Sequence, residues 1–141
     1  MTIIISKNNQ AYGINVEKMV TRMVKYIPDK YKEGLKEIHL LDKDLTNNCF
    51  ALYNKKAKRI ELYISEILEE QPWIIRKLYI LPYLSIGMAL GHELDHHVNR
   101  NNRNIDMEGS AETNSLKYIY PSMGVFKPLV RFLSIFSRKG G

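Results

Sequence analysis

The most constraining feature of the sequence is an uncharged apolar stretch, "LYILPYLSIGMALG" at residues 78–91, which leads directly into the polar run "HELDHH". Fourteen uncharged residues are too few to span a bilayer, because a membrane-spanning helix needs about 20. The stretch therefore predicts a buried core helix, over about residues 83–99, with polar side chains at its C-terminal end. Pro82 is expected to break or kink the start of this helical region.

The segments before this helix predict one more helix and a small sheet. Apolar residues at helical spacing predict a helix in "NVEKMVTRMVKYI", residues 15–27, which Pro28 ends. "LKEIHLLD", residues 35–42, predicts a short strand. "CFALYN" and "RIELYIS", residues 49–54 and 59–65, predict the two arms of a hairpin around the turn "KKAK".

The segments after the core helix predict further helices. A polar connector, "NRNNRN", separates the core helix from a second helix over about residues 105–120, and a last apolar helix is expected at 124–136. No alternating βαβ pattern is visible, so we expect an α+β fold with a small antiparallel or mixed sheet packed against helices. The chain suits a single domain, residues 1–141, in which 122–141 form either core or a regulatory, inhibitory tail.

Composition narrows the classes of protein that this chain can belong to. A single cysteine excludes an intrachain disulfide framework. The net charge is +6, but the basic residues are scattered without interleaved aromatic residues, so a solvated basic exterior is expected rather than a nucleic-acid interface. The N-terminus has neither the basic region nor the apolar length of a signal peptide, and a cytoplasmic protein without a membrane span is expected.

The polar run after the apolar stretch contains His92, Glu93 and His96 in the order H-E-x-x-H. Residues four apart on a helix are neighbours on one face, so the two imidazoles are able to bind one ion. Zinc suits such a site best, because catalytic zinc sites use three protein ligands and leave one position for water. Glu93 is placed to accept a proton from that water. The alternative is a polar helix face with two unconnected histidines.

A third ligand is expected from the next helix, in "DMEGSAETNSLKYI". Glu108 and Glu112 are four residues apart there. His96 lies near the end of the first helix and Glu108 near the start of the second, so an antiparallel pair brings their side chains to a similar height. Glu108 is therefore predicted to reach the ion. Glu112 is predicted to accept a hydrogen bond from the other ring nitrogen of His92. The alternative is an exposed acidic stripe.

The combination of H-E-x-x-H at residues 92–96 and E-x-x-A-E at residues 108–112 resembles the gluzincin metallopeptidases. In that clan a second helix supplies a glutamate as the third zinc ligand. The small size of the chain, "HELDHH", and "RIELYIS" before the motif helix resemble the minigluzincins, single-domain archaeal proteins.

This resemblance implies a zinc-dependent metallopeptidase. His92, His96 and Glu108 would be the zinc ligands and Glu93 the general base. The hairpin arm at residues 59–65 would be the edge strand that pairs with an extended peptide substrate. The minigluzincins resemble zymogens in which a terminal segment blocks the cleft, so residues 122–138 would do the same if they are not core.

Two other interpretations of the motif stay open. "HELDH" also resembles the H-E-x-D-H motif of the peptide deformylases, whose cysteine ligand lies upstream, and Cys49 precedes His92 by 43 residues. The cysteine stands in "NNCFA" rather than in the deformylase context "EGCLS". The second alternative is a zinc-binding protein without catalysis. Among the remaining polar residues, His97 is expected to point away from the ion.

The sequence also leaves the stabilisation of a developing oxyanion undecided. Tyr53, Tyr118 and Tyr120 are the candidates for the hydroxyl donor.

Overall fold

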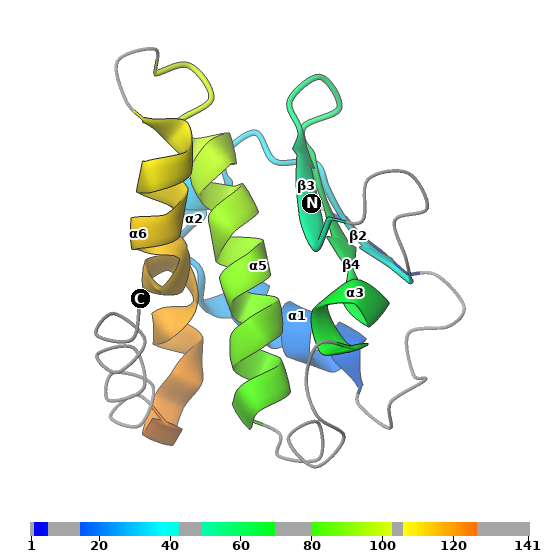
Figure 1. Ribbon diagram of the computed structural model, residues 1–141. Helices are drawn as coiled ribbons and strands as arrows, with labels where there is room; N and C mark the ends of the chain where they lie inside the picture. Colours follow the sequence, from blue (N-terminus) through cyan, green and yellow to red (C-terminus); the bar gives the residue numbers. More distant parts are fainter. Residues whose placement is uncertain (1, 6–14, 43–48, 70–79, 103–105, 127–141) are drawn as a thin grey trace.

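The structure is a computed structural model that describes residues 2–5, 15–42, 49–69, 80–102 and 106–126. The elements in chain order are β1 (Thr2–Ile5), α1 (Val16–Tyr26), α2 (Asp29–Lys32), β2 (Glu37–Leu41), β3 (Ala51–Asn54), β4 (Arg59–Tyr63), α3 (Ile64–Glu69), α5 (Ile80–Val98), α6 (Met107–Ile119) and the 3-10 helix η1 (Tyr120–Phe126). The predicted α+β fold, a small sheet packed against helices, is confirmed (Figure 1).

The sheet is mixed, with the strand order β1-β2-β4-β3. β3 and β4 pair antiparallel, which confirms the predicted hairpin, whereas β2 pairs parallel with both β1 and β4. The expectation that residues 59–65 form an edge strand is wrong, because β4 has a neighbour on each side. The edge strand beside α5 is instead β3, the first arm of the hairpin (Figure 1).

Two other elements differ from the expectation. The segment β1-α1-α2-β2 is a parallel crossover, so a βαβ unit is present although the sequence pattern did not indicate one. The strand expected through Ser65 ends at Tyr63, and α3 begins at Ile64. Ser65 donates both its backbone N–H and its hydroxyl to Asp42, which follows β2, and these bonds turn the chain out of the sheet.

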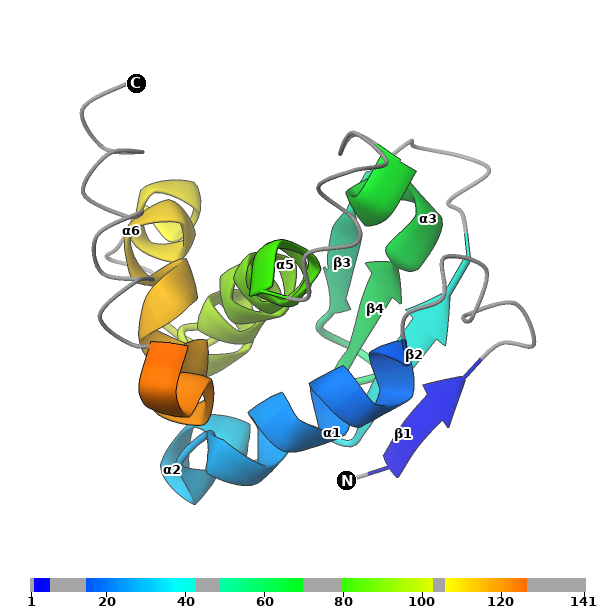
Figure 2. The same ribbon diagram turned by 90° about the horizontal axis from the view of Figure 1, so that it is seen from below.

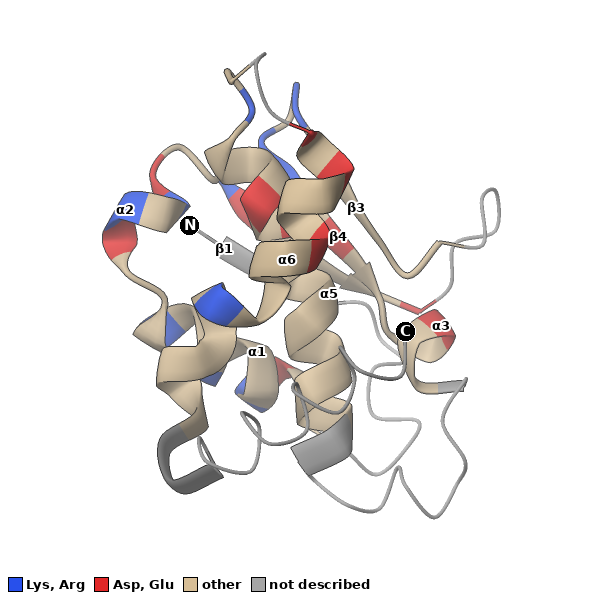
Figure 3. Cartoon of the chain, turned by 60° about the vertical axis from the view of Figure 1, so that its left-hand side comes forward, with Lys and Arg blue, Asp and Glu red and all other residues tan. Residues whose placement is uncertain are grey.

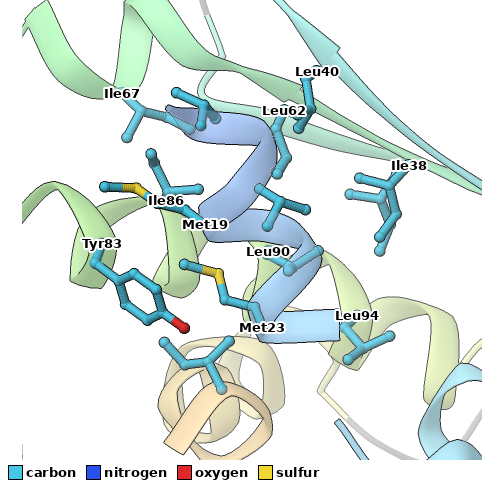
Figure 4. Packing of buried hydrophobic residues seen from close by; sticks show 14 of the residues in the cluster. Met19, Met23, Ile38, Leu40, Leu62, Ile67, Tyr83, Ile86, Leu90 and Leu94 are labelled. Carbon is cyan, nitrogen blue, oxygen red and sulfur yellow. The ribbon is translucent and has the colours of Figure 1, made fainter. Parts of the chain in front are cut away.

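The core lies between α1, the sheet and α5. Figure 4 shows apolar side chains from these three elements pointing toward one another. The buried residues that meet there include Met19, Val20 and Met23 of α1, Ile38, Leu40, Ile60 and Leu62 of the sheet, and Ile86, Leu90 and Leu94 of α5. The helical spacing in α1 and the alternation in β2 and β4 are therefore both explained by burial on one face.

The predicted motif helix is confirmed as α5, Ile80–Val98. Pro82 lies in its first turn, where a backbone N–H has no helical partner, so the helix tolerates it. In Figure 2, α6, α5 and the sheet follow one another across the molecule, and α1 runs along one side of them. No helix within the described ranges is long and apolar enough to cross a membrane.

The C-terminal prediction falls largely outside the described residues. The chain continues from α6 into the 3-10 helix η1 as far as Phe126. Most of the apolar helix expected at 124–136, and with it most of the predicted regulatory tail at 122–141, lies beyond that point.

The backbones of α5 and α6 come unusually close at Gly91, directly before the H-E-x-x-H motif. A Cβ added at Gly91 would overlap the backbone carbonyl oxygen of Ser115 on α6. Only a residue without a side chain permits this approach. Gly91 therefore sets the spacing that brings the first turn of α6 next to the motif histidines.

Replacing Gly91 with alanine is expected to lower the free energy of unfolding by about 1–3 kcal/mol, because α6 must move away. At an ordinary helix position, replacing glycine with alanine would instead raise the free energy of unfolding by about 1 kcal/mol. The close contact with α6 is therefore the reason why a decrease is expected at Gly91. Gly87→Ala is the matched control, since its Cβ would meet the end of the Ile119 side chain rather than the backbone of α6. Urea unfolding of both variants checks this, and equal stability of Gly91→Ala and the wild type would contradict it.

Candidate metal centre

Three side chains from two helices converge at the predicted metal site. His92 and His96 lie one turn apart on α5, and Glu108 comes from the first turn of α6. The Nε2 atom of His92 is 3.2 Å from one carboxylate oxygen of Glu108, and the Nε2 atom of His96 is 3.1 Å from the other. The structure thus brings together the three residues that the sequence predicts as ligands.

Each of these two distances is close to the separation of about 3.3 Å between neighbouring ligand atoms in a tetrahedral zinc site with bonds of about 2.0–2.1 Å. They join the two rings to different oxygens of the Glu108 carboxylate, which therefore bridges the rings. Two imidazoles and one carboxylate also form the donor set of known catalytic zinc sites. The residues present therefore fit a zinc ion.

Glu93 lies close to the same histidines. The ligand-capable atoms of His92, Glu93 and His96 all fall within 4.8 Å of one another, and these three form the only such group among the described residues. Glu108 nevertheless suits the third ligand position better, because its two oxygens contact both histidines directly. Glu93, beside the same two histidines, is then the candidate base.

The surroundings of Glu93 give it unusual acid–base properties. Its side chain is buried, and burial raises its pKa to about 7. His92 lowers this pKa, Glu108 raises it, and a hydrogen bond from the backbone of Tyr53 lowers it. A cation bound by the histidines would favour the ionised carboxylate. Without a cation, burial is thus the main influence on the pKa of Glu93.

An open cleft of about 660 Å³ gives access to these groups. It lies between the edge strand β3 and the helices α5 and α6. The residues that line it are Ala51, Leu52, Tyr53, Lys55, His92, Glu93, His96, Arg100, Asn102, Met107 and Glu108. The candidate metal ligands and the candidate base therefore face the same solvent-accessible space.

Asp95 has a role that the sequence analysis missed. It is buried, and its two carboxylate oxygens accept hydrogen bonds from α6, one from the Ser110 hydroxyl at 2.7 Å and one from the Tyr118 hydroxyl at 2.5 Å. Burial and this hydrogen bond raise the pKa of Tyr118. Asp95 therefore fixes α6 against α5 beside the metal site, and only the antiparallel pairing of the two helices reveals this.

His97 is turned away from the cluster, as its angle on the helix predicts. It is buried, and its Nε2 atom lies 2.8 Å from the carbonyl oxygen of Glu33, so this nitrogen carries the proton and donates. Its Nδ1 atom then accepts the hydroxyl hydrogen of Tyr53 at 2.7 Å. Burial lowers the pKa of His97, in agreement with a neutral ring. His97 thus anchors the edge strand to α5.

The expected hydrogen bond between Glu112 and His92 is not formed in the described part of the chain. Glu112 is exposed, and the ring Nε2 of His92 faces Glu108. Glu112 lies one turn of α6 beyond Glu108, and its side chain points to solvent rather than toward α5. The carboxylate that links the two helices here is Asp95.

The tyrosines considered as oxyanion donors are separated by the fold. Only Tyr53 lines the cleft, and its hydroxyl donates to His97. The Tyr118 hydroxyl donates to Asp95 in the interior. Tyr120 belongs to η1 and is not part of the cleft wall.

Cys49 lies apart from the candidate metal centre. It precedes β3, and it belongs neither to the cluster of ligand-capable residues nor to the lining of the cleft.

No protein-family model, no curated protein and no solved structure matches the chain.

Proposed function

We propose that the protein is a zinc-dependent peptidase that works as the gluzincins do. The observation that carries this proposal is the convergence of His92, His96 and the Glu108 carboxylate, with ring nitrogens and carboxylate oxygens 3.1–3.2 Å apart, beside the buried Glu93. A structural zinc site is closed by its four ligands and does not need a further buried carboxylate such as Glu93 beside them. The presence of Glu93 therefore favours catalysis over structural zinc binding.

In this proposal His92, His96 and Glu108 hold the ion. When bound, zinc supplies a Lewis acid that polarises the scissile carbonyl and acidifies the attacking water. Glu93 would accept the proton of that water and transfer it to the leaving amine, a role suited to a buried carboxylate beside the two histidines. Asp95 keeps α6 in place so that Glu108 reaches the ion.

The edge strand β3 supports binding of an extended peptide. The N–H of Tyr63 donates to the carbonyl oxygen of Phe50, so in this antiparallel pair Leu52 and Asn54 also direct their backbone groups toward β4. The backbone groups of Ala51 and Tyr53 consequently face the cleft, where the N–H of Tyr53 donates to Glu93. A substrate strand is able to pair with the backbone of Ala51 and place its peptide bond beside Glu93.

The test is zinc binding together with hydrolysis. The purified protein is expected to bind one zinc per chain and to cleave an unstructured protein substrate such as casein, with activity lost to a chelator and restored by zinc. His96→Ala should lose both properties, because two ligands hold the ion weakly. His39→Ala is the control, since this residue lies on β2 and pairs with Glu37.

Elemental analysis measures the zinc content and calorimetry the zinc affinity. Fluorescence from a labelled substrate measures the rate of hydrolysis. Equal zinc affinity of wild type and His96→Ala would reject the metal site. Normal zinc binding without cleavage of any peptide would reject the peptidase.

A further inference from the structure

The cleft contains two cationic side chains that the proposed reaction does not use, Lys55 and Arg100. Without a metal, they balance the two carboxylates of the lining, Glu93 and Glu108. A divalent cation at the histidines neutralises those two carboxylates and leaves the cleft with two uncompensated positive charges. The inference drawn from these charges rests on the proposed function.

Neither cation is neutralised by a carboxylate of the described chain. Within the described part of the chain, Lys55 and Arg100 form no ion pair with a carboxylate. Lys55 is exposed in the hairpin turn. Both side chains are therefore available to an anion in the cleft.

Arg100 is held in place. Its Nη1 atom donates to the carbonyl oxygen of His97 at 2.8 Å. Its Nη2 atom lies against Gly34, where a Cβ would come within 3.2 Å and where the backbone φ of +83° favours glycine. A guanidinium positioned in this way loses little conformational freedom when it binds a carboxylate.

Both cations lie at one end of the cleft. β3 runs toward the turn that begins with Lys55, and α5 runs in the same direction toward Arg100 (Figure 1). Figure 3 shows the basic residues of the turn and of the end of α5 gathered at this end of the molecule. A peptide that pairs antiparallel with β3, the more stable arrangement, places its amino-terminal residues there.

We propose that the cleft selects peptides with an acidic side chain on the amino-terminal side of the scissile bond, and that Lys55 and Arg100 bind this carboxylate. The specificity arises because a peptide with glutamine in place of glutamate would leave the positive charges of Lys55 and Arg100 without a negative partner. Attraction between partly exposed charges weakens with salt, so the preference should decrease as ionic strength rises.

The experiment compares fluorogenic peptides in matched pairs, with Glu or Gln placed two or three residues before the cleaved bond. The wild type is expected to prefer the Glu peptide by up to about fivefold in kcat/KM, since an exposed ion pair contributes up to about 1 kcal/mol. Lys55→Glu should abolish or reverse this preference. Lys56→Glu is the matched control, because Lys56 is an exposed neighbour in the same turn that does not line the cleft.

Fluorescence anisotropy with the same peptides separates this inference from the proposed function. Equal cleavage of Glu and Gln peptides, or a preference only for an acidic residue after the scissile bond, would overturn the inference and leave the peptidase intact. Acid-selective binding that depends on Lys55, without hydrolysis of any peptide, would support the acidic ligand and reject the peptidase. An equal loss of preference in Lys55→Glu and Lys56→Glu would reject the roles of the two cations.

Discussion

Replacing Glu93 with glutamine is expected to lower kcat/KM for a peptide substrate by about 10²–10⁴-fold while zinc stays bound. Glutamine has nearly the same shape as glutamate and its carbonyl oxygen still accepts the hydrogen bond from the backbone of Tyr53. The substitution removes only the ability to take up and deliver a proton. Zinc affinity should change little, because the proposed mechanism makes Glu108 rather than Glu93 the third ligand.

The measurement pairs peptide hydrolysis with zinc content in the same preparation. Glu17→Gln serves as the control, because Glu17 is an exposed residue of α1 that does not line the cleft. Full hydrolytic activity in Glu93→Gln would eliminate the general-base role. Loss of zinc in this variant would mean that Glu93 is itself a ligand, in keeping with its place beside His92 and His96.

The sequence predicted the elements whose periodicity reflects burial on one face. Met19 and Met23 recur at helical spacing because α1 packs one side on the core, and Ile60 and Leu62 alternate because β4 does the same. Both patterns are local, so they need no knowledge of the partner. The H-E-x-x-H geometry was predictable for the same reason, since the helix alone fixes it.

The errors concern pairings between distant segments. β1 has four residues, and its strand state depends on parallel pairing with β2 more than thirty residues later. Which arm of the hairpin lies at the edge depends on β2 as well, because β2 pairs with β4. The alternation of Ile60, Leu62 and Ile64 continues past the end of the strand, so only the bonds from Ser65 to Asp42 show where it stops.

The site was also predictable only where local helix geometry determines it. Glu108 could be placed from the lengths of two antiparallel helices, because height along the pair depends only on residue count. The rotation of α6 about its own axis could not be derived in this way. It decides that Ser110 and Tyr118 face Asp95 while Glu112 faces solvent.

Replacing Glu108 with glutamine is expected to weaken zinc binding by more than the roughly 10–100-fold that loss of an outer-shell partner costs. The amide keeps the shape of the side chain but removes the anionic ligand that contacts both histidines. Glu112→Gln is the matched control, because it lies on the same helix, is also exposed and contacts neither ring. Its zinc affinity should stay close to that of the wild type.

The substitution Cys49→Ser tests the deformylase-like alternative, in which the Cys49 thiol would be a zinc ligand. Zinc binding should be nearly unchanged, because Cys49 is not part of the ligand cluster or the cleft. Zinc content after dialysis against a graded chelator ranks the three variants, and a formyl-methionyl peptide should not be a substrate. If Cys49→Ser lost its zinc while Glu108→Gln kept it, the thiol would be the third ligand, α6 would have no role in binding the ion, and the gluzincin-like mechanism would be abandoned.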